Sequence, residues 1–140
     1  MNLSLEREGE FVPVNMVENN TRCGPIGHMH YKYAVRIEAT DDSLSEEGFV
    51  IENSRIHNYF LTRYCDYGRS FTAISCEKMA IKASMEIGRT LVKEKISVTK
   101  VIVTIFGSNN ARLTATWTPD AEKKNATTQT TRRGNGRASR

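Results

Sequence analysis

Two histidines and a cysteine stand close together in the N-terminal quarter of the chain, and their types and spacing suit metal chemistry. Cys23 precedes His28 and His30 in the stretch CGPIGHMHYKY. Residues i and i+2 of a strand point to the same face, so the two imidazoles can reach one cation such as zinc. Zinc takes at least three protein ligands, so the pair does not complete a site, and two polar residues at a strand entry are the alternative reading.

The thiol of Cys23 is a candidate catalytic group. A thiol beside a bound metal ion has a lowered pKa and can transfer protons, whereas an inert loop thiol needs no such neighbour. The chain has three cysteines without a CxxC spacing, which argues against a disulfide framework and against a cysteine zinc knuckle. We therefore expect reduced thiols. The third histidine, His57, is expected on a helix and is not proposed as a ligand.

Six elements are expected to position these residues. Strict alternation predicts a strand over 31–39, and a second, apolar strand is expected over 11–17, where Pro13 confines it to an edge or a bulge. Asn53 and Ser75 are good N-caps for helices to Tyr64 and Lys93. The runs 98–106 and 112–117 read as a hairpin. The order β-β-α-α-β-β predicts an α+β fold in which both helices cover one face of an antiparallel sheet. Open sheet edges favour an oligomer that closes the sheets into a barrel.

This element order, with four short motifs, resembles the 6-pyruvoyl-tetrahydropterin synthase and 6-carboxy-tetrahydropterin synthase family. The motifs are CGPIGHMH at 23–30, GFVIEN at 48–53, SCEKMA at 75–80 and VTIFGSNN at 103–110. The resemblance implies the tunnelling fold, a homo-oligomeric, trimer-based barrel, and a zinc-dependent carbon–oxygen lyase acting on a pterin such as dihydroneopterin triphosphate. It also implies roles for seven residues: catalytic Cys23 and Asp66, zinc-binding His28 and His30, and substrate-binding Ser75, Cys76 and Glu77.

Three positions depart from the family pattern. Asn15 stands where the family has a third zinc histidine, and Tyr67 follows Asp66 where the family has an Asp-His pair. The glutamate that grips the pterin in the last hairpin corresponds to Phe106 or Ile105, and neither can accept those hydrogen bonds. Glu77 also has a simpler role, because an acidic residue in the first turn stabilises a helix. A relative that keeps the fold without the reaction is therefore the alternative.

The net charge of +4 over 140 residues lies entirely in the C-terminal segment. Residues 119–140 hold six basic and two acidic residues and no large aliphatic or aromatic side chain, so we expect a flexible basic tail after a single domain of residues 1–118. Such a tail can contact nucleic acid or an acidic partner, or can act as a solubilising extension. The chain contains no apolar run of about 18 residues, and acidic groups stand in its first twenty residues, so we expect no membrane partner and a cytoplasmic location.

Overall fold

The structure, a computed structural model, describes residues 2–13, 30–40, 51, 53–65, 74–107 and 112–121. Six elements follow one another in these residues: β1 (Asn2–Phe11), β2 (Tyr31–Thr40), α1 (Asn53–Tyr64), α2 (Cys76–Lys93), β3 (Val98–Phe106) and β4 (Arg112–Trp117). This order confirms the predicted β-β-α-α-β-β arrangement and the α+β class.

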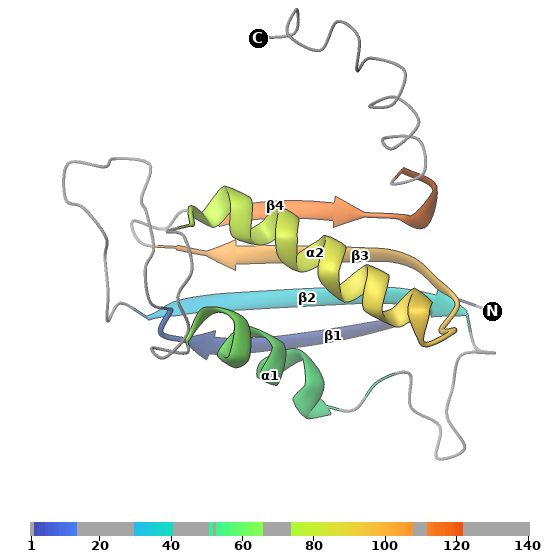
Figure 1. Ribbon diagram of the computed structural model, residues 1–140, viewed down its shortest axis with the longest axis horizontal. Helices are drawn as coiled ribbons and strands as arrows, with labels where there is room; N and C mark the ends of the chain where they lie inside the picture. The colour runs from blue at the N-terminus through green and yellow to red at the C-terminus, as the bar shows by residue number, and fades with distance from the viewer. Residues whose placement is uncertain are drawn as a thin grey trace, which may run out of the picture.

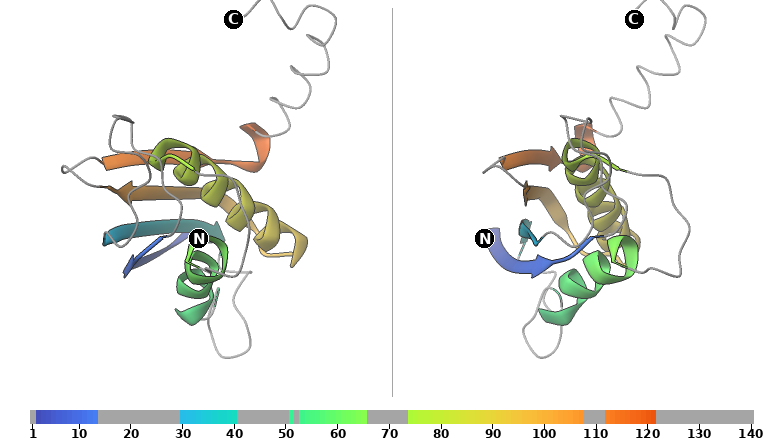
Figure 2. Two further views of the ribbon diagram at one scale, coloured as in Figure 1. Left: turned by 60° about the vertical axis from the view of Figure 1, so that its left-hand side comes forward. Right: turned by 90° about the vertical axis from the view of Figure 1, so that its left-hand side faces the viewer.

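The four strands form one antiparallel sheet in the order β1-β2-β3-β4. Both helices lie against the same side of this sheet (Figures 1 and 2). Strand alternation therefore separates a helix-covered face from an open face. On β2 the covered positions are each at most 2% exposed: Tyr31, Tyr33, Val35, Ile37 and Ala39.

Each helix buries the face that its sequence period predicts. On α1 the buried residues are Ile56, Phe60 and Tyr64, and on α2 they include Met79, Ala83 and Leu91. Ser75 is the N-cap of α2, since its Oγ accepts a hydrogen bond from the backbone N–H of Lys78 at 3.2 Å. Neither of these two helices combines the length and the apolar character that crossing a membrane needs.

The expected first strand was wrong in position. The prediction was 11–17, whereas β1 ends at Phe11, and Val12 and Pro13 follow it outside any strand. The covered positions of β1 include Arg7 and Gly9, so the strand lacks the continuous apolar alternation that marks β2. Tyr33 of β2, which pairs with Gly9, fills the space: a Cβ on Gly9 would lie 2.5 Å from the Tyr33 Oη. The rest of the expected strand, residues 14–17, lies outside the described residues.

A second glycine brings α2 down onto the last strand. Gly88 is buried on α2, and a Cβ there would lie 2.2 Å from Cε3 of Trp117, the last residue of β4. Because Gly88 has no side chain, the indole can pack directly against the helix backbone. This contact sets how closely α2 approaches the β3–β4 side of the sheet.

Candidate functional site

One end of the sheet gathers the segments that carry the expected site residues. The register pairs Phe11 with Tyr31, and pairs Lys32 with Phe106, which in turn pairs with Arg112. The end of β1, the start of β2, the end of β3 and the start of β4 therefore meet there. Figure 1 shows the end of α1 and the start of α2 at the same end, on the left of the view. We call this the hairpin end of the sheet.

The structure describes only part of the expected metal and catalytic set. Cys23, His28 and Asp66, together with Asn15, lie outside the described residues. His30 is described: it directly precedes β2 and is exposed. Tyr31 faces the core, so alternation assigns His30 to the side of the open face.

Zinc is the metal that the resemblance implies, and the described residues test its fit only in part. Within them no group of three or more His, Cys, Asp or Glu side chains could hold a metal ion. Of the expected zinc-binding pair, the structure describes His30 and does not describe His28. We derive no chemical step through zinc from this arrangement.

The three expected substrate-binding residues begin α2 at the hairpin end. Ser75 caps the helix, Glu77 is exposed in the first turn, and Cys76 is a core residue with 3% exposure. Capping and the helix dipole account for Ser75 and Glu77 without a ligand. Their roles in substrate binding stay predictions.

The two candidates for the anchoring position differ in where they point. Ile105 has no exposed surface and belongs to the core, whereas Phe106 is partly exposed on the open face. Two cations lie over the Phe106 ring: the Lys32 Nζ at 5.4 Å from its centroid and the Arg112 Cζ at 5.0 Å. We call Phe106, Lys32 and Arg112 the Phe106 platform. It consists of an aromatic ring with two positive charges next to it.

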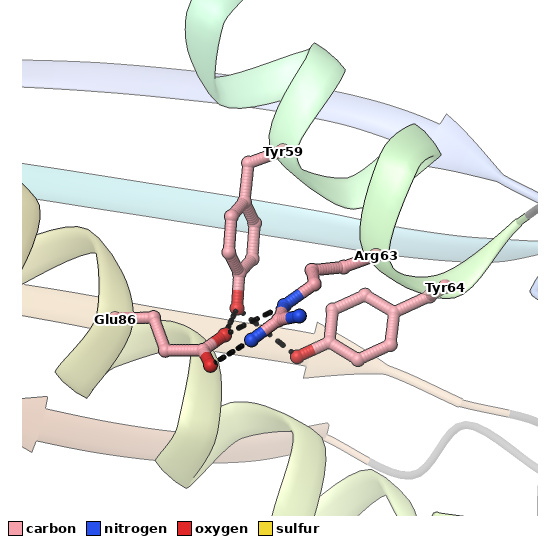
Figure 3. A network of polar contacts seen from close by, with 4 residues as sticks. All are labelled: Tyr59, Arg63, Tyr64 and Glu86. Carbon is pink, nitrogen blue, oxygen red and sulfur yellow. Dashed lines mark hydrogen bonds and ion pairs between the residues drawn. The ribbon is translucent and has the colours of Figure 1, made fainter. Parts of the chain in front are cut away.

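A polar network that the sequence reasoning missed joins the two helices (Figure 3). The Tyr59 hydroxyl donates to Glu86 Oε1, and Arg63 donates to both oxygens of Glu86, with Nε to Oε1 at 3.2 Å. The hydroxyls of Tyr59 and Tyr64 lie 3.1 Å apart. Glu86 follows Arg63 by 23 residues, so no spacing rule connects them.

The pKa shifts of this network keep its two phenols neutral and its carboxylate and guanidinium ionised. Burial raises the pKa of Tyr59 and of Tyr64, so both phenols stay protonated. Burial also acts to raise the pKa of Glu86, but hydrogen bonds from Arg63 and Tyr59 outweigh it and lower that pKa. The hydrogen bond to Glu86 raises the pKa of Arg63. The network is therefore a neutral tyrosine pair around a fixed ion pair, which suits a tie between helices better than proton transfer.

Hollows of different sizes lie beside this network, and two open ones at the surface, of about 380 and 400 Å³, are lined in part by Tyr59 and Arg63. A hollow of about 90 Å³ lies between α1 and α2, below the about 300 Å³ at which ligand pockets begin. Its lining residues are Ile51, Arg55, Ile56, Tyr59, Ile87, Thr90 and Leu91.

His57 of α1 has a structural partner on β2. Its Nδ1 lies 2.9 Å from the Tyr33 Oη, and the Tyr33 ring stacks on Phe60 at 4.3 Å between centroids. Burial raises the pKa of Tyr33, so its hydroxyl stays protonated. This histidine connects α1 to β2.

Comparison with known proteins supports the fold. No protein-family model matches the chain, and no curated protein does. A solved structure of a catalytic-residue mutant of Plasmodium vivax 6-pyruvoyltetrahydropterin synthase is similar, with a TM-score of 0.52 and 14% identity over 83% of this chain and 99% of that chain. A second catalytic-residue mutant of that enzyme gives 0.49 and 17% with the same coverage. The likeness to the first of these structures shows the tunnelling fold, as predicted.

Proposed function

We propose that this tunnelling-fold protein binds a pterin-type heterocycle at the hairpin end of its sheet, with zinc held by His28 and His30. The observation that carries the proposal is the meeting of His30, the capped start of α2 and the β3–β4 hairpin at one end of a fold shared with a pterin enzyme. These segments lie far apart in sequence. Because the segments meet at one place, their polar residues can act together at one site, and the core does not need these residues.

The proposal assigns a role to each expected residue. His28 and His30 would hold the metal, which would supply a Lewis acid beside the substrate side chain. Cys23 and Asp66 transfer protons, and the first turn of α2, with Ser75, Cys76 and Glu77, contacts the ligand. The corresponding reaction is a carbon–oxygen lyase step on a substrate similar to dihydroneopterin triphosphate.

Metal content tests this proposal most directly. We expect about one zinc per chain, bound by histidine side chains. The measurement is mass spectrometry of protein purified without chelator. The variant His30→Ala should lose the zinc. His57→Ala is the matched control, because His57 pairs with Tyr33 and should leave the metal in place. Protein that stays free of zinc after zinc is offered at neutral pH, or that loses it equally in both variants, would overturn the zinc site.

A second candidate function is a non-catalytic member of the same fold with a structural or partner-binding role. Phe106 favours it, because an aromatic ring cannot accept the hydrogen bonds of a guanidine-like pterin edge. In that case the segment 119–140 contacts nucleic acid or an acidic partner. A complex with nucleic acid that disappears on truncation after Pro119, in a protein without lyase activity, would support this candidate over the first.

We also propose that the chain associates with itself into a barrel. β1 and β4 are the edges of the four-stranded sheet and leave backbone groups free to pair with another copy. The α2 flank that carries Gly88 also exposes apolar side chains, with Ile81 at 51% and Val92 at 45%. On this proposal Ile81→Ser weakens association in analytical ultracentrifugation and Lys82→Ser does not. A protein that is monomeric at every concentration would contradict it.

A further inference from the structure

The two helices carry a positive charge, although the first 118 residues are neutral in sum. α1 and α2 together contain six basic and two acidic residues, a net charge of +4. Both helices lie on one side of the sheet, and in Figures 1 and 2 no other described element covers their outer side. The positive charge is therefore concentrated on one face of the protein.

Four of these cations form a line along α2. They are all exposed: Lys78, Lys82, Arg89 and Lys93. With 3.6 residues per turn, the four positions lie within about 60° of one another around the helix axis, and the line is about 22 Å long. We call these four residues the α2 basic stripe. The exposed apolar residues Ile81 and Val92 lie beside it, on the flank of α2 toward Gly88.

The acidic residues near the α2 basic stripe have other partners or positions. Glu86 accepts hydrogen bonds from Arg63 of α1. Glu94, which follows α2, accepts two from Arg55, at 2.8 and 2.7 Å. Glu77 lies about 100° around the helix from the first residue of the stripe. Among the described residues, three cations of the stripe form no ion pair: Lys78, Lys82 and Lys93.

A straight line of exposed cations is complementary to the backbone of a nucleic-acid duplex. Each strand of a duplex carries one charge about every 3.4 Å along the axis, so such a line meets phosphates in any register. Neutral donors also contact phosphates. Thr90 and Arg89 line one open hollow, Asn58 and Thr62 line a second, and both hollows reach Arg63. Proteins that bind single strands stack bases on aromatic side chains, and α2 contains no aromatic residue.

We propose that the α2 basic stripe binds the phosphate backbone of a nucleic-acid duplex. Contacts to phosphates fix the position of the protein and carry no sequence information, so this binding does not depend on base sequence. The proposal goes beyond the proposed function and does not rest on it, because it needs neither zinc nor a pterin. It also differs from the second candidate function, in which the segment 119–140 makes the contact.

The test is fluorescence anisotropy of a labelled DNA duplex of about 20 base pairs, titrated with the full chain at several salt concentrations. The logarithm of the affinity falls with the logarithm of the salt concentration, with a slope of about 0.9 for each neutralised phosphate. A triple variant with Lys78→Gln, Lys82→Gln and Lys93→Gln should make this slope shallower by about 3. At about 0.1 M salt it should weaken binding by about tenfold or more.

Two matched controls locate the binding. Lys82→Gln alone should make the slope shallower by about 1, whereas Lys100→Gln, on the open face of β3 across the sheet, should leave it unchanged. The second control removes three charges from the segment 119–140, with Arg132→Gln, Arg133→Gln and Arg137→Gln. Its effect should be smaller than that of the triple variant of α2. Thermal unfolding of each variant separates lost binding from lost folding.

Several results would overturn the proposal. The first is a wild-type protein that does not bind the duplex, or a triple variant of α2 that binds it as the wild type does. A loss confined to the variant of the segment 119–140 would assign the contact to that segment. An oligothymidine strand that binds about tenfold tighter than the duplex would assign the surface to single strands. Polyglutamate that displaces the duplex at equal charge concentration would assign it to an acidic protein.

Discussion

The contact between Gly88 and Trp117 predicts how Gly88→Ala changes the stability of the protein, and two opposing effects decide the sign of that change. Replacing a helix-interior glycine by alanine ordinarily stabilises a protein by about 1 kcal/mol, because alanine has the higher helix propensity. Here the new methyl group would lie 2.2 to 2.6 Å from three atoms of the indole ring. The ring is rigid and 6% exposed, so it has little room to move away.

The size of the expected stability loss follows from how much shorter these distances are than ordinary carbon contacts. Ordinary carbon contacts lie near 3.5 to 4.0 Å, so α2 and Trp117 must separate by about 1 Å. Overpacking of this kind costs about 1 to 3 kcal/mol. After subtraction of the propensity gain, we expect Gly88→Ala to lower the free energy of unfolding by about 1 kcal/mol.

Urea unfolding followed by circular dichroism measures this change. Trp117 is the chain's single tryptophan, so its fluorescence also reports the local displacement. Thr90→Ala is the control, because Thr90 is exposed on the same helix and should gain about 0.5 kcal/mol from propensity alone. In the Trp117→Leu background the cost of Gly88→Ala should vanish. A single Gly88→Ala variant that is more stable than wild type would refute the packing argument.

Other substitutions test further contacts. Gly9→Ala should cost about 1 to 3 kcal/mol, because the methyl group meets the Tyr33 ring, and it should show as a lowered urea midpoint. Tyr59→Phe removes a hydroxyl that donates to Glu86 and should cost about 1 to 2 kcal/mol in the same assay; an unchanged midpoint would contradict the tie between helices. The lowered pKa of Glu86 means that its ionised form is favoured by folding, so this contribution is complete above about pH 4.3, the ordinary glutamate value, and is lost as pH falls through the lower folded-state pKa. Glu86→Gln should therefore flatten the acid side of the stability profile, and an unaltered acid slope would show that Arg63 does not hold the charge.

The case of β1 shows where reasoning from sequence failed and why. A period-two apolar pattern marks a strand only when its covered positions are apolar, and β1 places Arg7 and Gly9 there. The alternation of Glu6, Glu8 and Glu10 on the exposed side was the available signal. Phe11 was placed correctly in a strand, but as its last residue and not its first. What stabilises this strand is Tyr33 of the neighbouring strand, which no local pattern of 2–11 reveals.

The residues of the candidate site also fall into two groups: those whose relation the sequence spacing predicts and those that only the fold brings together. Spacing along the chain could pair His28 with His30 and could place Ser75 and Glu77 at the start of a helix, because those relations depend on strand and helix periods. It could not predict that Lys32 and Arg112 lie on either side of Phe106, since that depends on the register of three strands.

By itself the sequence determined the two helices and the strands β2, β3 and β4, together with the side of β2 and of each helix that faces the core. These features follow from local periods of 3.6 and 2 residues and from caps within a few residues of one another. The tertiary structure alone decided the start of β1, the close approach of α2 to β4 at Gly88, and the network that joins Tyr59 to Glu86. A hydrophobic pattern records that a side is buried, but the partner that buries it comes from distant chain segments whose packing the local pattern does not specify.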